Sequence, residues 1–138
     1  MISMDHVSFG YGENQETLSR ISMAVAPGEC VLLCGASGCG KTTVTKLING
    51  LIPAFTPGCR LEGRVEVDGL DPAKTPMHQL ARKVGSVFQN PKSQFFNLYT
   101  DSELAFGLEN AGCPPEEIHA RVAETVEALG LESLCGQS

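Results

Sequence analysis

Residues 35–43 read GASGCGKTT and follow directly after the apolar run CVLLC at 30–34. The stretch 35–42 matches the pattern G-x-x-x-x-G-K-[ST]. Its glycines let the backbone turn sharply and approach a ligand closely, so that successive amides point toward an anion. A helix beginning near Lys41 would add a favourable dipole. The pattern therefore predicts a phosphate-binding loop between a strand and a helix, formed by Gly35, Ala36, Ser37, Gly38, Cys39, Gly40, Lys41, Thr42 and Thr43.

Three side chains of this loop have the chemistry that a nucleotide needs. The ammonium group of Lys41 supplies a point charge for the β- and γ-phosphates, and the hydroxyl of Thr42 is a ligand for Mg²⁺. Thr43 can donate a hydrogen bond to the α-phosphate. Cys39 is interpreted as a small residue that the loop tolerates.

The pattern around the loop predicts a mixed α/β fold. Alternation and turn residues predict antiparallel strands at 2–11 and 17–27 and a short strand before the turn at Asp68–Gly69. The apolar run before the loop predicts a strand buried in a parallel sheet, and 84–90 predicts another strand. Helical spacing and end signals predict helices over 41–51, 75–85, 100–110 and 114–130, with Thr75 and Thr100 as N-caps.

Composition and charge exclude several classes of protein. The net charge is −6 and the 10 Lys and Arg residues are scattered, which argues against nucleic-acid binding by bulk charge. No run approaches the roughly 18 to 20 apolar residues of a membrane span, and the N-terminus lacks a signal-peptide pattern, so we expect a cytoplasmic protein. The six cysteines include no C-x-x-C pair, so we expect reduced thiols rather than a zinc site.

Several longer segments resemble the ATPase subunits of ABC transporters. These are FGYG at 9–12, ISMAVAPGECVLLCGASGCGKTTVTKLINGLI at 21–52, GRVEVDGLD at 63–71 and VGSVFQNP at 84–91. The resemblance implies that Tyr11 stacks on adenine and that Gln89, as the Q-loop residue, reaches Mg²⁺ and the water near the γ-phosphate. From the residues alone, Tyr11 could equally be an exposed aromatic at a strand end, and Gln89 an ordinary polar residue.

The segment QNPKSQFFNLYTDSELAFGLEN at 89–110 is similar to the ATPases of energy-coupling-factor importers for vitamins and metal ions such as cobalt. From the residues alone, Phe95 and Phe96 could belong to a core. In that family this region meets the membrane subunit, which would instead place one of them in an exposed groove. The implied cofactors are ATP and Mg²⁺. The implied partners are a transmembrane importer subunit and a second ATPase subunit, with the protein peripheral on the inner face of the cell membrane.

The resemblance also predicts how the chain is organised. It implies an α/β fold: a partial P-loop NTPase core with an N-terminal antiparallel β subdomain and a C-terminal helical segment. Residues 1–138 are expected to form the N-terminal part of one ABC-type ATPase domain. Within it, 1–95 would be the β subdomain and P-loop core, and 96–138 the start of the helical subdomain.

The sequence lacks two elements that this family uses for hydrolysis. It contains no LSGGQ-type signature and no four apolar residues followed by Asp-Glu. We therefore expect this chain to bind nucleotide without efficient turnover, and to self-associate through an uncovered sheet edge near Val31, Leu32 and Leu33. The alternatives are a free-standing nucleotide-binding or regulatory module, or another P-loop NTPase or kinase. The absence of an N-K-x-D segment in the sequence argues against a GTPase.

Overall fold

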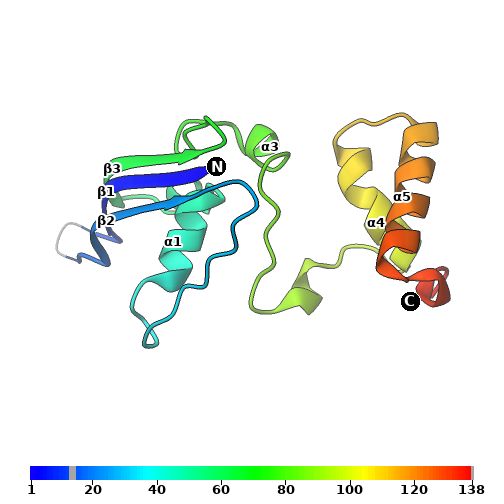
Figure 1. The fold of residues 1–138 in the computed structure, drawn as a ribbon, viewed down its shortest axis with the longest axis horizontal. Helices are drawn as coiled ribbons and strands as arrows, with labels where there is room; N and C mark the ends of the chain where they lie inside the picture. Colours follow the sequence, from blue (N-terminus) through cyan, green and yellow to red (C-terminus); the bar gives the residue numbers. More distant parts are fainter. Residues whose placement is uncertain (13–14, 138) are drawn as a thin grey trace. The chain divides into compact units, whose positions relative to one another are not determined.

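The computed structural model describes residues 1–12 and 15–137. The chain divides into two compact units, Met1–Ser86 and Val87–Ser138. The first unit contains a β-sheet with helices, and the second is helical (Figure 1). Within the described residues, no helix has the length and apolar character needed to cross a bilayer.

The first unit is built around a three-stranded antiparallel sheet. Strand β1 (Ile2–Gly10) lies between β2 (Leu18–Val25) and β3 (Arg60–Val67). Ile2 lies opposite Val25 on one side and Val67 on the other. All three strands were predicted from the alternation of the sequence, and the tight turn at Asp68–Gly69 is also confirmed, with both residues at positive φ.

Helix α1 (Lys41–Ile48) packs against this sheet (Figure 1). Its buried residues join side chains from all three strands in one apolar cluster: Met4, Val7, Phe9, Leu18, Val44, Leu47, Ile52 and Val65. Phe9 and Leu47 are almost completely buried. Because residues 41–43, the last of the predicted phosphate loop, form the first turn of α1, this core fixes the end of the loop to the sheet.

Two helices of the first unit are shorter than the sequence predicted. Helix α1 ends at Ile48, and α2 covers only Leu51–Ala54. The helix expected over 75–85 is limited to α3 (Met77–Leu80), whose N-cap is Pro76. The prediction of Thr75 as the N-cap is wrong, because its hydroxyl donates to the carbonyl of Asp71 at 2.7 Å.

Two predicted strands are not formed. Residues 28–35 and 84–90 are neither strand nor helix in the structure, and Leu32 is 84% exposed. A strand in a parallel sheet needs hydrogen-bonded neighbours and cover on both faces. In the described residues the sheet contains only the three antiparallel strands, so neither segment has a neighbour with which to pair.

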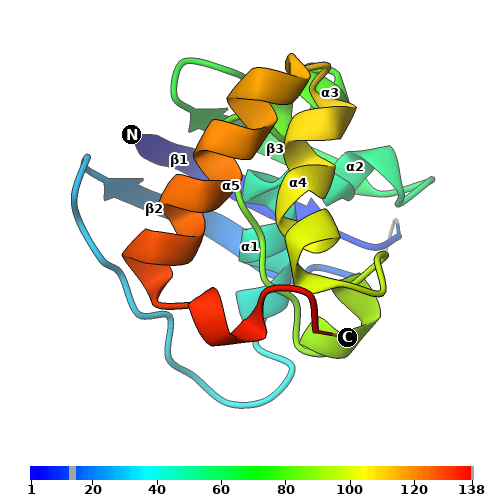
Figure 2. The same ribbon diagram turned by 90° about the vertical axis from the view of Figure 1, so that its right-hand side faces the viewer.

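The second unit is a helical hairpin. Helices α4 (Thr100–Asn110) and α5 (Pro115–Leu129) run side by side (Figure 2), and the 3₁₀ turns η1 (Pro91–Gln94) and η2 (Glu132–Leu134) flank them. Both helices match the prediction closely, and Gly130 ends α5 in the left-handed conformation.

The start of α4 differs from the predicted capping box. The N-cap position is Tyr99, and Thr100 donates its side-chain hydrogen bond to the carbonyl of Gln137. The carboxylate of Glu103 instead accepts the backbone N–H groups of Phe96 at 3.1 Å and Asn97 at 2.8 Å. Glu103 therefore stabilises the turn before α4 by accepting these two hydrogen bonds, and does not form the predicted capping box with Thr100.

Candidate functional site

The phosphate-loop sequence ends at the N-terminus of α1. Gly40 precedes the helix with a φ of 93°, and its carbonyl accepts the first helical hydrogen bond, from the N–H of Val44 at 3.0 Å. The amides of Lys41, Thr42 and Thr43 have no acceptor within the helix, as in any first turn. No side chain caps this helix end in the described part of the chain. The result is a group of backbone donors, reinforced by the helix dipole, that suits an anion.

Lys41 is folded back over the loop. Its ammonium group donates to the carbonyl oxygens of Gly35 at 2.8 Å and Ala36 at 2.6 Å, and lies 3.5 Å from the sulfur of Cys39. These carbonyl contacts hold the positive charge beside the loop backbone. An oxyanion that entered the loop would meet both the amides and this cation.

Two glycines allow the close approaches that shape the loop. A Cβ at Gly40 would lie 2.7 Å from Cδ2 of Leu18, and a Cβ at Gly35 would lie 2.7 Å from the sulfur of Cys39. Gly40 thus brings the N-terminus of α1 into contact with the first residue of β2. The loop and the turn between β1 and β2 are therefore neighbours.

Tyr11 lies at that turn, beside the phosphate loop. Its hydroxyl is 3.3 Å from Oγ1 of Thr43, and its ring forms a T-shaped pair with that of Phe9, with the centroids 4.8 Å apart. Thr43 is 4% exposed, whereas Tyr11 is 43% exposed. The structure thus brings Tyr11 and Thr43, 32 residues apart in sequence, into one site.

Thr42 and Gln89, the two residues expected near Mg²⁺, lie in different units. The Thr42 side chain is exposed on the first turn of α1, and Gln89 is exposed in the loop before η1. A hydroxyl and a side-chain amide supply the oxygen ligands that Mg²⁺ prefers, and this ion is commonly completed by phosphate oxygens and water. Among the described residues, no group of three or more His, Cys, Asp or Glu side chains could hold a metal ion.

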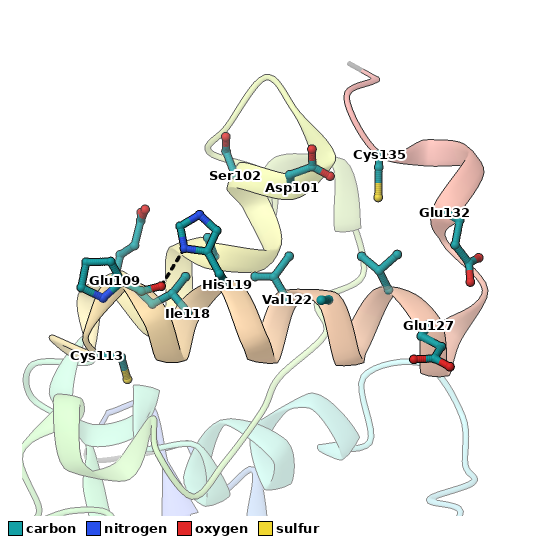
Figure 3. A pocket seen from close by; sticks show the side chains of 14 residues that line it. Asp101, Ser102, Glu109, Cys113, Ile118, His119, Val122, Glu127, Glu132 and Cys135 are labelled. Carbon is teal, nitrogen blue, oxygen red and sulfur yellow. Dashed lines mark hydrogen bonds between the residues drawn. The ribbon is translucent and has the colours of Figure 1, made fainter.

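The second unit contains an open groove along α4 and α5, with a volume of about 1160 Å³ (Figure 3). Ile118, Val122 and Val126 form its apolar side. Asp101 accepts the N–H of Gly136 at 3.1 Å, and its carboxylate raises the pKa of the Cys135 thiol, also at the groove.

An exposed aromatic surface lies in the loop before α4. Phe95 is 65% exposed and Phe96 is 76% exposed, although the Phe96 ring stacks on Phe106 with the centroids 5.2 Å apart. Of the two interpretations that the sequence allowed, the structure places both rings on the surface rather than in a core.

Known proteins are similar to this chain in sequence and fold. The ABC transporter family model matches residues 18–137. A protein of Treponema denticola, named as an ABC transporter ATP-binding protein, is 49% identical over 97% of this chain and 27% of its own length. A cobalt import ATP-binding protein of Syntrophus aciditrophicus is 41% identical over 96% of this chain and 46% of its own length.

A solved structure has the same fold. It is cbiO1 from Clostridium perfringens, part of the ABC transporter complex cbiONQ, with a TM-score of 0.81 and 26% identity over 97% of this chain and 52% of the other. The chain thus spans about half or less of the proteins it matches. The similarity confirms the predicted P-loop NTPase fold class, and the family match shows that this chain belongs to the ABC transporter family, among its ATP-binding subunits.

Proposed function

We propose that this chain is the nucleotide-binding portion of an ABC transporter ATPase of the energy-coupling-factor type. The observation that carries the proposal is the uncapped N-terminus of α1, with the Lys41 ammonium held 2.6 Å from the carbonyl of Ala36 and Tyr11 beside it. An amide cradle, a fixed cation and an exposed aromatic ring are the groups that recognise phosphates and a base. The ligand that combines them is ATP with Mg²⁺.

Each predicted site residue has a role in this proposal. The loop residues Gly35 to Thr43 bind the phosphates, with Lys41 at the β- and γ-phosphates, and the ring of Tyr11 stacks on adenine. Thr42 and Gln89 hold Mg²⁺, which when bound neutralises charge on the phosphate oxygens. Gln89 would also position the attacking water in the whole protein.

The whole protein would couple ATP hydrolysis to the import of a vitamin or metal ion. The names of the relatives support this, since one is a cobalt import protein and another, of Ligilactobacillus salivarius, is an energy-coupling factor transporter ATP-binding protein. Its partners would be a transmembrane importer subunit and a second ATPase subunit, at the inner face of the cell membrane. The exposed Phe95 and Phe96 support a contact with the membrane subunit. In the ATPase domain proposed here, residues 1–95 would form the β subdomain and P-loop core, and residues 96–138 would begin the helical subdomain.

This chain alone would bind nucleotide without efficient turnover. Phosphoryl transfer depends on positioned charge around an in-line water, and the sequence 1–138 contains neither an LSGGQ-type signature nor an apolar run ending in Asp-Glu. Nucleotide affinity and hydrolysis should therefore be separable in this chain.

The proposal can be tested by titrating the purified chain with a fluorescent ATP analogue, with and without Mg²⁺. Competition with ATP and GTP then measures the preference for the base. We expect saturable binding that Mg²⁺ strengthens and ATP displaces, with phosphate release at background rate. No binding at millimolar nucleotide would overturn the proposal, and turnover above ~1 per second would overturn its second part.

A further inference from the structure

The hydroxyls of Tyr11 and Thr43 form a hydrogen-bonded pair where the turn after β1 meets α1. The oxygens are 3.3 Å apart. Thr43 is 4% exposed, so its hydroxyl is closed off from most of the solvent, whereas Tyr11 is 43% exposed. A buried hydroxyl is satisfied by a protein partner, and here the partner is the phenol of Tyr11.

Both residues are fixed to the same core. The rings of Tyr11 and Phe9 pack in a T-shaped pair with an interplanar angle of 86°, and Phe9 is fully buried. The turn that carries Tyr11 is closed by the N–H of Thr17, which donates to the carbonyl of Phe9 at 2.7 Å. Val44, next to Thr43, belongs to the same apolar cluster as Phe9. The pair therefore joins two anchored elements rather than two mobile loops.

These contacts restrain the phenol ring at two points, the packing of the ring on Phe9 and the hydrogen bond of its hydroxyl. A tyrosine held by its backbone alone can rotate about its side-chain torsions, and any ordering on binding opposes affinity. With its hydroxyl bonded and its ring packed on Phe9, the exposed part of the Tyr11 ring keeps a fixed orientation beside the phosphate loop. A fixed orientation favours stacking on a flat base.

We propose that Thr43 is a positioning residue for Tyr11, and that the pair selects nucleotides over base-free polyphosphates. This inference rests on the proposed function, because it assigns the selection to the same site. Thr43 acts here through its hydroxyl and Tyr11, not through a contact of its own with the base. Loss of one such hydrogen bond should lower the preference for a nucleotide by about three- to tenfold.

The first test measures the orientation of Tyr11 without any ligand. The chain has two tyrosines and no tryptophan, so Tyr99→Phe leaves Tyr11 as the fluorophore. In that background we expect Thr43→Val to lower the fluorescence anisotropy of Tyr11 and to increase its quenching by acrylamide. Thr43→Ser keeps the hydroxyl and should restore both values. A Tyr11 signal that is the same in the Val and Ser variants would overturn the restraint.

The second test measures selectivity, as the ratio of affinities for ATP and inorganic triphosphate. Thr43→Val and Tyr11→Phe should each lower this ratio by about three- to tenfold, and the double variant by no more than either alone, because both remove the same bond. Thr43→Ser should keep the ratio. Equal loss of affinity for ATP and triphosphate would mean that Thr43 acts on the phosphates alone, and would overturn the positioning role.

The two proposals fail in different ways. A wild-type chain that binds neither ligand contradicts the proposed function, and removes the base-selecting role with it. A wild-type chain that binds both ligands, with a ratio that does not respond to Thr43 or Tyr11, overturns only the further inference. Circular dichroism of each variant checks that α1 and the sheet are intact, and the Ser variant tests the hydroxyl if the Val variant fails to fold.

Discussion

The side-chain ammonium of Lys41 donates a hydrogen bond to the carbonyl oxygen of Ala36 at 2.6 Å, so the positive charge of Lys41 is held by the backbone of the loop. The same ammonium also donates to Gly35. A phosphate that displaced these carbonyls would gain a charge-assisted hydrogen bond in their place.

Removing the cation should weaken nucleotide binding strongly. Lys41→Ala is expected to lower affinity for a fluorescent ATP analogue by about 10- to 100-fold, because charge-assisted hydrogen bonds to the phosphates are lost. Lys46→Ala, in the last turn of the same helix, is the matched control and should change affinity little. Equal affinities for wild type and Lys41→Ala would contradict the phosphate-loop assignment.

Glycines of the loop should differ in their tolerance of a side chain. Gly38 and Gly40 both have positive φ, but a Cβ at Gly38 meets nothing within 4 Å, whereas one at Gly40 meets Leu18. We expect Gly38→Ala to cost about 1 to 2 kcal/mol of unfolding free energy from backbone strain. Gly40→Ala should cost about 1 to 3 kcal/mol more, since Leu18 must move. Urea unfolding measures both, and equal costs would contradict the contact.

Two leucines test whether the segment before the loop is buried. Leu47 is 1% exposed, so Leu47→Ala should destabilise the first unit by about 2 to 5 kcal/mol. Leu32 is 84% exposed, and Leu32→Ala should change stability by no more than about 0.5 kcal/mol. Thermal and urea unfolding provide the measurement. A large cost at Leu32 would show that residues 30–34 pack as the sequence predicted.

The turn before α4 should open on acidification. The backbone N–H of Asn97 and then that of Phe96 hold the pKa of Glu103 below its ordinary value of 4.5. Since the folded state favours the charged form, this stabilisation is present above about pH 4.5 and is lost as the pH falls through the lowered pKa. The NMR shifts of the Phe96 and Asn97 amides should titrate in that window.

A matched pair of variants isolates this carboxylate. Glu103→Gln should remove the titration of the two amides, while Glu124→Gln, at an exposed position on α5, should leave it in place. Amide shifts that titrate unchanged in Glu103→Gln would show that another group controls the turn.

Exposed apolar surface should make this chain self-associate. Val31, Leu32 and Leu33 are 46%, 84% and 38% exposed and lie in a segment without a strand partner in the described sheet. We expect dimers or larger species, or marginal stability, by light scattering coupled to size exclusion and by thermal melts. Leu32→Lys should reduce the association. A monodisperse wild-type monomer that melts above ~65 °C would contradict this expectation.

Local patterns predicted most of the secondary structure. The start of α1, the three strands and the bounds of α4 and α5 depend on periodicity and end signals that lie within a few residues. The segments 28–35 and 84–90 have equally clear strand patterns, but a parallel strand exists only where distant residues pair with it. Pattern alone could not show that such neighbours are missing from the described sheet. The capping roles of Thr75 and Thr100 were wrong because Asp71 and Gln137 compete for their hydroxyls.

The sequence predicted only the part of the site that depends on local pattern. The phosphate loop is continuous in sequence, so its composition and spacing predicted it directly. The contact between Tyr11 and Thr43 joins residues 32 positions apart and depends on how α1 packs on Phe9 and Leu18. Only the folded structure shows that Thr43, which the sequence places at the phosphate, also forms a hydrogen bond with Tyr11.

The irregular backbone of residues 29–36 also determines how this chain can be observed. Amides outside helices and strands exchange with solvent much faster than those of a central strand such as β1. Mass spectrometry after deuterium labelling should therefore find the segment leading into the loop fully labelled at the earliest times. A peptide beginning at Gly35 would then start from a high level of exchange, and its slowing on addition of a ligand would report occupancy of the loop directly.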